Sequence, residues 1–408
     1  MKRWTVLLLS SLLAACAVAP PAQRDARFFH DRLFAAPAER IGADDLFAVS
    51  DDMKRYIDDA IADPARVKGR QRALIDALYS NGQLRLEYDT EMTRNAAQAF
   101  AARSGNCLSL VIMTAAFAKE LGLMVEYQKV FVDDTWARTG DIYLAIGHVN
   151  VSLGPRKTDQ GGGGYRVGVK PHESDSMTID FVPSTDLRAV RTRAIDEEII
   201  VAMYMNNRAV EALARDQADT AYWWAREAVA RTPGFLMPYN TLGAIYRRHG
   251  NPEEAEQVLS HVLDREPRNT QAMSNLIPVL NDLGRVEAAQ RLAARLEELD
   301  PEPPFSHFNR GMAAMRAGDP KTAKDEFARE VARAPDYHEF HFWLGIAYLN
   351  NGEIEPARRH LTLAMKNSTT RRDHDVYAAK LARINELHSE RRRRRRASRR
   401  RSAGRRLA

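Results

Sequence analysis

Cysteine and long apolar runs are both scarce in this 408-residue sequence. Its 2 cysteines are Cys16 and Cys107. Beyond the N-terminus, no stretch approaches the roughly 18 apolar residues that read as a membrane-spanning helix. The glycine run at 161–164 lacks a following helix and a lysine at P-loop spacing, which argues against a P-loop nucleotide site. The bulk of the chain is therefore predicted to be a water-soluble body without such a site.

The N-terminus predicts export. Lys2 and Arg3 precede a short apolar run at 6–13, followed by LAAC at 13–16. This pattern is typical of a secretory signal and is too short for a spanning helix. Its LAAC end resembles a bacterial lipobox, so lipidated Cys16 would tether the body to a membrane, facing the periplasm at the outer membrane. The alternative is an ordinary signal peptide in which Cys16 plays no part.

With Cys16 lipidated, Cys107 remains as a single thiol that cannot form an internal disulfide. A leftover cysteine in an exported protein indicates a reactive thiol. Free cysteine is equally typical of a buried core position. The cysteine count leaves both interpretations open.

An arginine-rich tail closes the sequence. Residues 391–406 contain 11 arginines, so a whole-chain charge of +6 leaves −5 for residues 1–390. A block of like charges repels itself and stays disordered, which makes a solvated tail at 390–408 one interpretation. The other is attraction to anionic lipid headgroups or envelope sugars. Nucleic acid is not an expected partner of an exported protein.

A 34-residue period organises the second half of the sequence. Prolines, glycines and alanines each recur at this spacing, in register with one another. The pattern matches the tetratricopeptide repeat (TPR), a helix pair that stacks into a solenoid. Units start near residues 202, 236, 270, 304 and 338. The landmarks are Pro233, Pro267, Pro301 and Pro335; Gly250, Gly284, Gly318 and Gly352; and Ala221, Ala255, Ala289, Ala323 and Ala357.

The repeat predicts a core and a groove. Tyr239, Leu242 and Tyr246 fall at helical spacing and are expected to be buried, and the next glycine ends the helix. The first unit has Asp216 in place of that glycine, and a final helix at 373–387 is expected to cap the stack. The concave groove would hold a peptide or protein partner. The pair His338 and His341 lacks a carboxylate partner, so no metal site is predicted.

Cys107 is predicted in the first turn of a buried helix, after Ser104-Gly105-Asn106. Unpaired backbone N–H groups and the positive end of the helix dipole stabilise a thiolate there. The same N–H groups can receive an oxyanion. A thiolate nucleophile also needs a base, and the base needs an orienting partner.

Strands that follow this helix supply both groups. The segment at 123–132 is β-like, and a later strand carries His148, Asn150 and Ser152 on one face. Asp180 lies among apolar residues in a further strand at 176–183. Because such residues meet only in the fold, their separation in sequence is no obstacle to a Cys-His-Asp site.

The blocks AAQAFAARSGNCLSLVIMTAAFAKELGL, GHVNV and TIDFVP resemble the bacterial transglutaminase-like, papain-related superfamily over residues 70–185. The resemblance implies that Cys107 is the nucleophile, His148 the general base and acid, and Asp180 the group that orients the imidazole. Asn106 and Gln128 are the two candidates for the side-chain oxyanion donor. The chain departs from transglutaminases in having Val149 and Asn150, where aromatic residues usually follow the histidine.

The predicted architecture is an α+β transglutaminase-like (papain-like) domain at 24–190, preceded by a signal peptide at 1–16. An all-α TPR solenoid at 201–389 follows it. The first functional hypothesis is hydrolysis or transfer of amide groups in envelope proteins or peptides, without cofactor or metal. The alternative is a catalytically inactive scaffold for envelope protein assembly. A third interpretation is an adhesin driven by the arginine tail.

Overall fold

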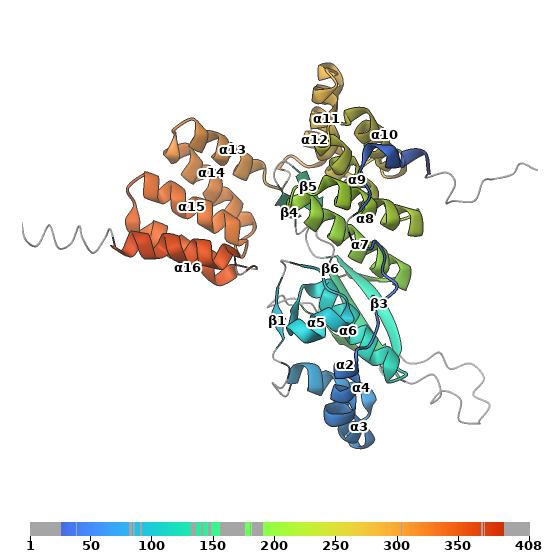
Figure 1. Ribbon diagram of the computed structural model, residues 1–408. Coiled ribbons are helices and arrows are strands. Elements are labelled where there is room, and N and C mark those ends of the chain that lie inside the picture. The colour runs from blue at the N-terminus through green and yellow to red at the C-terminus, as the bar shows by residue number, and fades with distance from the viewer. Residues whose placement is uncertain are drawn as a thin grey trace, which may run out of the picture.

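The computed structural model describes a mixed helical and stranded unit followed by a stack of paired helices (Figure 1). Cys16, Asp180, the glycine run at 161–164 and the tail at 390–408 lie outside the described residues. The described residues are 26–37, 39–80, 84, 86–89, 92–131, 136–139, 142–145, 148–155, 176–179, 181, 191–302, 304–368, 370 and 372–386.

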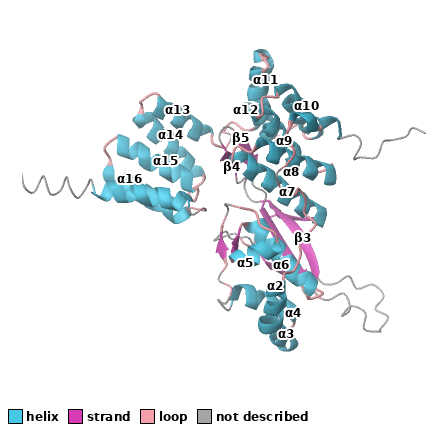
Figure 2. Cartoon of the chain, viewed as in Figure 1, coloured by secondary structure: helices cyan, strands magenta, loops and turns pink. Residues whose placement is uncertain are grey.

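Short helices open the N-terminal unit (Figure 2). The predicted cap at Ser50 is confirmed, since its Oγ accepts a hydrogen bond from the Met53 N–H at 3.3 Å. Asn95 and Gln98 form a capping box that starts the helix before the cysteine. The helices are α2 (Asp51–Tyr56), η3 (Ile57–Ile61), α3 (Ala62–Lys68), α4 (Arg70–Ile75), η4 (Asp76–Ser80), α5 (Ala96–Ala102) and α6 (Cys107–Glu120).

A four-stranded antiparallel sheet packs against α6, in the order β7-β6-β3-β8. One face is apolar and carries Val149, Val151 and Leu153, which are fully buried in the core beside α6. The opposite face is polar, as expected from the alternation along the strand beginning at His148. The strands are β3 (Met124–Phe131), β6 (His148–Gly154), β7 (Met177–Ile179) and β8 (Arg191–Ile195).

Two smaller strand pairs are separate from this sheet. The parallel pair β1 (Glu87–Tyr88) and β2 (Ser104–Gly105) lies directly before α6. The antiparallel pair β4 (Trp136–Thr139) and β5 (Ile142–Ala145) reaches the solenoid, where β5 contacts α11. The β-like segment DIYLAIGHVNVSL at 141–153 contains β5 and most of β6.

Antiparallel helix pairs make up the second half. Gly250, Gly284, Gly318 and Gly352 end the first helices of their pairs with φ of 72–86°. Asp216 adopts the same left-handed conformation, with φ 59°, at the glycine position of the first pair. The helices are α7 (Glu197–Ala214), α8 (Ala218–Arg231), α9 (Met237–Arg248), α10 (Pro252–Arg265), α11 (Thr270–Asp282), α12 (Val286–Leu299), α13 (Ser306–Arg316), α14 (Pro320–Arg333), α15 (His338–Asn350) and α16 (Ile354–Asn367), followed by helical residues 372–386.

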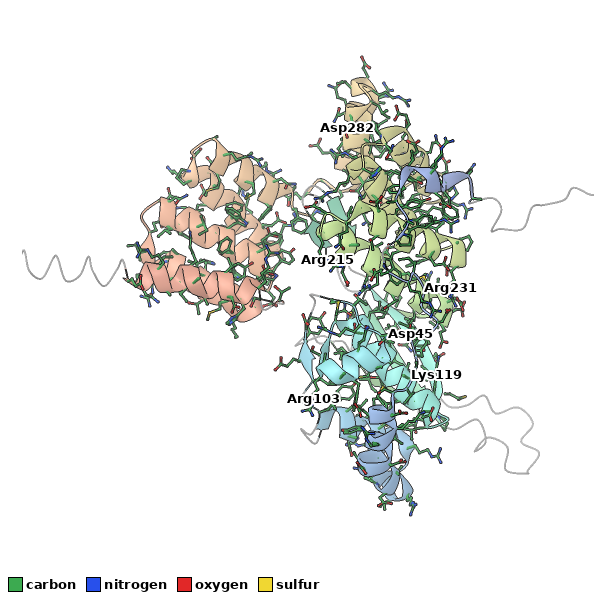
Figure 3. The ribbon with its side chains drawn as sticks, viewed as in Figure 1. Asp45, Arg103, Lys119, Arg215, Arg231 and Asp282 are labelled. Carbon is green, nitrogen blue, oxygen red and sulfur yellow. The ribbon has the colours of Figure 1, made fainter. Side chains whose placement is uncertain are left out.

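The first solenoid helix, α7, packs against the N-terminal unit. Lys119, labelled in Figure 3 at the end of α6, forms an ion pair with Glu197 at the start of α7. The Tyr127 hydroxyl of β3 donates a hydrogen bond to the same carboxylate at 2.8 Å. One hydrophobic core accordingly extends from Phe28 through α6 and the sheet to Ala289 of α12.

Residues 26–37, here called the N-terminal strap, lie along the solenoid and include η1 (Ala26–Phe28) and η2 (Asp31–Leu33). Figure 1 shows this dark blue segment crossing α10 and running beside α7–α9. Phe34 stacks on Tyr222 of α8, with ring centroids 3.9 Å apart. The Tyr246 hydroxyl of α9 donates to the Phe28 carbonyl at 2.6 Å. The expected N-terminal domain included these residues, whereas the structure places them on α8–α10.

None of the helices in the described part of the chain is long and apolar enough to cross a membrane.

Candidate functional site

Cys107 is the first residue of α6 and is buried, with 6% of its surface exposed. Asn106 caps the helix: its Oδ1 accepts from the Ser109 backbone N–H and from Ser109 Oγ, each at 2.9 Å. The cap fixes the direction of the first turn, where backbone N–H groups carry partial positive charge. The position suits a stabilised thiolate, and it equally suits a small core residue.

Polar contacts hold Asn106 from its other end. Its Nδ2 donates to Thr93 Oγ1 at 2.8 Å. The backbone N–H of Arg94 donates to Ser109 Oγ at 2.8 Å. Thr93 and Ser109 are fully buried. The start of α6 is therefore anchored to residues 93–94 as well as capped.

His148 is the first residue of β6, the strand that packs against α6, and it is 7% exposed. It pairs with Val130 of β3. Asp180 follows directly after β7, which pairs with β6, and lies outside the described residues. The meeting of Cys107, His148 and Asp180 therefore stays a prediction.

Gln128, one of the two oxyanion candidates, lies on the polar face of the sheet. It pairs with Asn150 across β3 and β6, and its Nε2 donates to Ser152 Oγ at 3.3 Å. Ser152 in turn shares a 2.6 Å hydrogen bond with Thr178 of β7. The other candidate, Asn106, uses its side chain as cap and anchor. Both oxyanion assignments stay predictions.

Tyr88 approaches Cys107 and was not anticipated from the sequence. The β1–β2 pairing sets Tyr88 opposite Gly105, two residues before the cysteine. Its hydroxyl lies near the thiol and the backbone of Cys107. Although 39% of the residue is exposed, burial of the hydroxyl end and then the nearby thiol raise the pKa of Tyr88 above its ordinary value. No motif surrounds Tyr88, so only the strand pairing reveals it.

The strap rests on a charged cluster at α8. Asp31 Oδ1 accepts from the Tyr222 hydroxyl at 2.6 Å and from Arg226 Nε at 2.8 Å. Burial acts to raise the pKa of Asp31, but the bonds from Arg226 and Tyr222 outweigh it and lower that pKa. Asp31 is thus held as a carboxylate that fastens the strap to the solenoid.

The solenoid histidines have protein partners. His338 Nδ1 lies 2.8 Å from the Tyr377 hydroxyl. The two Nδ1 atoms of His341 and His360 are 3.0 Å apart, and His341 Nε2 is 2.7 Å from the Pro335 carbonyl oxygen. Among the residues that the structure describes, no three His, Cys, Asp or Glu side chains are grouped to hold a metal ion.

The repeat geometry agrees with family comparisons. Tetratricopeptide-repeat family models match residues 246–307 and 308–367. The C-terminal half of the chain consists of TPR repeats. Tyr239, Leu242 and Tyr246 of the second TPR unit are fully buried, which confirms their predicted place in the core. TPR solenoids characteristically offer extended surfaces for binding proteins or peptides.

Solved structures similar to this chain include TPR proteins. A thermophilic TPR protein of Thermus thermophilus is 20% identical, with a TM-score of 0.33 over 44% of this chain and 99% of that one. PilF of Pseudomonas aeruginosa is 17% identical, with a TM-score of 0.31 over 48% and 88%. YrrB, described as a TPR protein with an unusual peptide-binding site, is 20% identical, with a TM-score of 0.24 over 44% and 92%. No curated protein matches the chain.

These matches concern the TPR half. The transglutaminase-like fold of residues 70–185 stays a prediction, as do the lipid anchor at Cys16 and the envelope location. The structure describes strands and helices in that part of the chain, with the sheet order given above.

Proposed function

We propose that the chain is an envelope protein, tethered at lipidated Cys16, in which Cys107 performs acyl transfer on amide bonds and the TPR solenoid recruits the substrate or its partner. The observation that supports the proposal is the position of Cys107 at the start of a capped, anchored helix. The approach of His148, which the alternation along β6 puts on the polar face of the sheet, is part of the proposal. The arginine tail would add attraction to anionic lipid headgroups.

The proposed reaction divides amide cleavage into two steps. The Cys107 thiolate attacks the carbonyl carbon, and backbone N–H groups of the first turn of α6 stabilise the oxyanion. Collapse of the tetrahedral intermediate breaks the C–N bond, and imidazolium His148 gives its proton to the leaving amine. Water or a second amine then attacks the thioester, gives a proton to His148 and releases the Cys107 thiolate. Asp180 orients the imidazole in this scheme.

A non-catalytic scaffold is the second candidate, and Tyr88 favours it. The Tyr88 hydroxyl lies near the Cys107 thiol and backbone, where the carbonyl of a substrate would have to approach. In this scheme the N-terminal unit is a rigid platform, and the solenoid binds envelope proteins. Catalysis would require a substrate to displace the Tyr88 hydroxyl from this position.

Alkylation of Cys107 tests the two candidates. In the full-length chain carrying Cys16→Ser, Cys107 is the single thiol, and its alkylation rate with iodoacetamide is measured from pH 5 to 10. Acyl transfer predicts a rate that persists well below the free-cysteine pKa of about 8.5 and falls in His148→Ala. A thiol that reacts only near that value, or only after denaturation, would reject the nucleophile and support the scaffold.

A further inference from the structure

A buried polar cluster connects the first TPR helix to the start of the Cys107 helix. Its centre is Thr93, a fully buried residue between β1 and α5. Asn207 and Glu211 of α7 approach it from the solenoid, and Asn106 approaches it from α6. The cluster thus lies where the two halves of the chain meet.

Thr93 is bonded through both its backbone and its side chain. Its backbone N–H donates to Glu211 Oε1 at 2.6 Å. Its Oγ1 accepts from Asn207 Nδ2 at 3.2 Å and from Asn106 Nδ2 at 2.8 Å. One hydroxyl therefore receives a donor from the solenoid and a donor from the residue before Cys107.

Asn106 transmits this anchoring to the helix. Its Nδ2 is held by Thr93, while its Oδ1 accepts the Ser109 backbone N–H in the first turn of α6. Both ends of the Asn106 carboxamide are thus held by hydrogen bonds. These bonds fix the orientation of the first turn of α6, which contains Cys107. Hydrogen bonds in a low-dielectric interior are stronger than in water, so the loss of one member disturbs the rest.

On the solenoid side of the cluster, Glu211 and Arg208 of α7 have further polar partners. Burial raises the pKa of Glu211, and its bonds to Thr93 and the nearby Arg208 act in the opposite direction. The Arg208 guanidinium reaches the Glu39 carboxylate at 3.4 Å, and Glu39 Oε1 accepts from Trp224 Nε1 of α8 at 2.7 Å. A polar chain therefore extends from the first TPR helix pair to the cap of α6.

We propose that Asn207 and Glu211 of the first TPR helix are positioning residues for Cys107, acting through Thr93 and Asn106, so that the solenoid completes the thiol site. The inference rests on the proposed function and extends it. A partner that displaces α7 would change the reactivity of the thiol, and the N-terminal unit without α7 would hold Cys107 in a loosened first turn.

Thr93→Val tests the inference in the full-length chain carrying Cys16→Ser. The substitution keeps the shape of the residue but removes the oxygen that accepts Asn106 and Asn207. Because the helix start would no longer be aimed at the thiolate, we expect the midpoint of the alkylation pH profile to rise by about half a pH unit or more. Thr93→Ser, which restores the hydroxyl, should return the midpoint toward the parent value.

Thr114→Val is the matched control. Thr114 is fully buried in α6, the helix that begins at Cys107. Its hydroxyl is hydrogen-bonded to the Leu110 carbonyl and the Tyr79 hydroxyl, away from the Asn106 cap. Equal alkylation profiles for Thr93→Val and Thr114→Val would overturn the inference. If Thr93→Val does not fold, Asn207→Ala takes its place, and a profile unchanged from the parent would overturn the inference in the same way.

The proposed function and this inference fail in different ways. An alkylation midpoint near the free-cysteine value that does not respond to His148→Ala rejects the nucleophile. In that case the comparison of Thr93→Val with Thr114→Val still measures whether the Thr93 hydroxyl positions the thiol, and Asn207→Ala measures the share that comes from the solenoid. A normal His148 dependence with no difference between the two threonine variants rejects only the positioning role.

Discussion

The solenoid contains two hydrophobic cores of different kinds. The core of α7–α12 is shared with the N-terminal unit and reaches Ala289. The core of α13–α15 is separate and is built around Phe305, Phe308, Phe327 and Phe340. Figure 1 shows α13–α16 set apart from α7–α12. The 34-residue period continues across this division, so a regular repeat in sequence does not define one cooperative unit.

Side chains at equivalent repeat positions account for the division. Leu242 and Tyr246 of α9 are buried against neighbouring helices, whereas two repeats later α13 has Arg310 and Ala314 at these positions. Arg310 is exposed and pairs with Glu326 at 3.0 Å. On the other side of the junction, Val286 of α12 is 49% exposed. The described buried residues of α7–α12 and those of α13–α15 fall in separate hydrophobic clusters.

The largest expected effect on stability comes from removing one buried phenylalanine in each core, which tests whether the two cores unfold independently. Phe117→Ala removes a fully buried ring that meets Phe100 and Tyr56 in the first core, and Phe308→Ala removes one in the second core. Each should cost about 3–5 kcal/mol of its own unit's stability. Hydrogen exchange resolved by segment should show α9 losing protection only in Phe117→Ala, and α15 only in Phe308→Ala. Equal losses in both helices would mean a single cooperative solenoid.

Two helix glycines should give the next largest effect. A Cβ at Gly243 would lie 2.6 Å from Leu259 Cγ, and one at Gly311 would lie 2.5 Å from Phe327 Cε1. Alanine at either position overpacks its helix pair and should cost about 1–3 kcal/mol. Thermal unfolding should show the two variants lowering different transitions.

Gly250→Ala is the control for these variants. Gly250 has φ 86°, and a Cβ added there would have no neighbour within 4 Å, so alanine meets backbone strain without overpacking. Its cost should be about 1 kcal/mol, and it should affect the first core. A shift of one common transition by all three variants would contradict the two-core description.

The smallest expected effect is a loss of stability of the second core at acid pH, caused by protonation of His360. Burial, then the nearby His341 and Arg359, lower the pKa of His360 to about 4. Between about pH 6.5 and pH 4, His360 is protonated in the unfolded chain but stays neutral in the folded chain. The free energy of unfolding therefore decreases as the pH falls from about 6.5 toward 4. Because the ring is partly exposed, we expect only about 1 kcal/mol.

His360→Gln checks this expectation. Between pH 7 and pH 5, the unfolding midpoint of α13–α16 should fall by a few degrees more in the parent chain than in the variant. A variant as acid-sensitive as its parent would assign the effect to other groups.

The repeats were predictable because their residues act locally. The expected starts near 236, 270, 304 and 338 lie within two residues of α9, α11, α13 and α15, and the helix expected at 373–387 is found at 372–386. Asp216 shows why the first unit folds despite its irregular sequence, since it adopts the positive φ that glycine has in the others. The 34-residue period could not reveal the division of the hydrophobic core before α13. That division depends on whether Arg310 and Ala314 can pack against the preceding repeat.

The site was less predictable because its parts are distant in sequence. Local signals were sufficient to place Cys107 at a helix start and His148 on a strand. Tyr88 and Thr93 lie in no motif: strand pairing brings Tyr88 near Cys107, and a hydrogen bond joins Thr93 to Asn106, the residue before Cys107. The polar cluster adds Glu211, more than a hundred residues away in sequence.

In the proposed lipid-anchored protein, the N-terminal strap would limit how far the folded part of the chain lies from the membrane. Ten positions separate Cys16 from Ala26, where the strap begins on α10. At about 3.3–3.6 Å for each extended residue, this tether spans at most about 36 Å. In the proposed lipid-anchored protein, the first TPR units would stay within roughly one domain diameter of the bilayer. The protein would then meet partners that lie at the membrane surface before those farther into the periplasm.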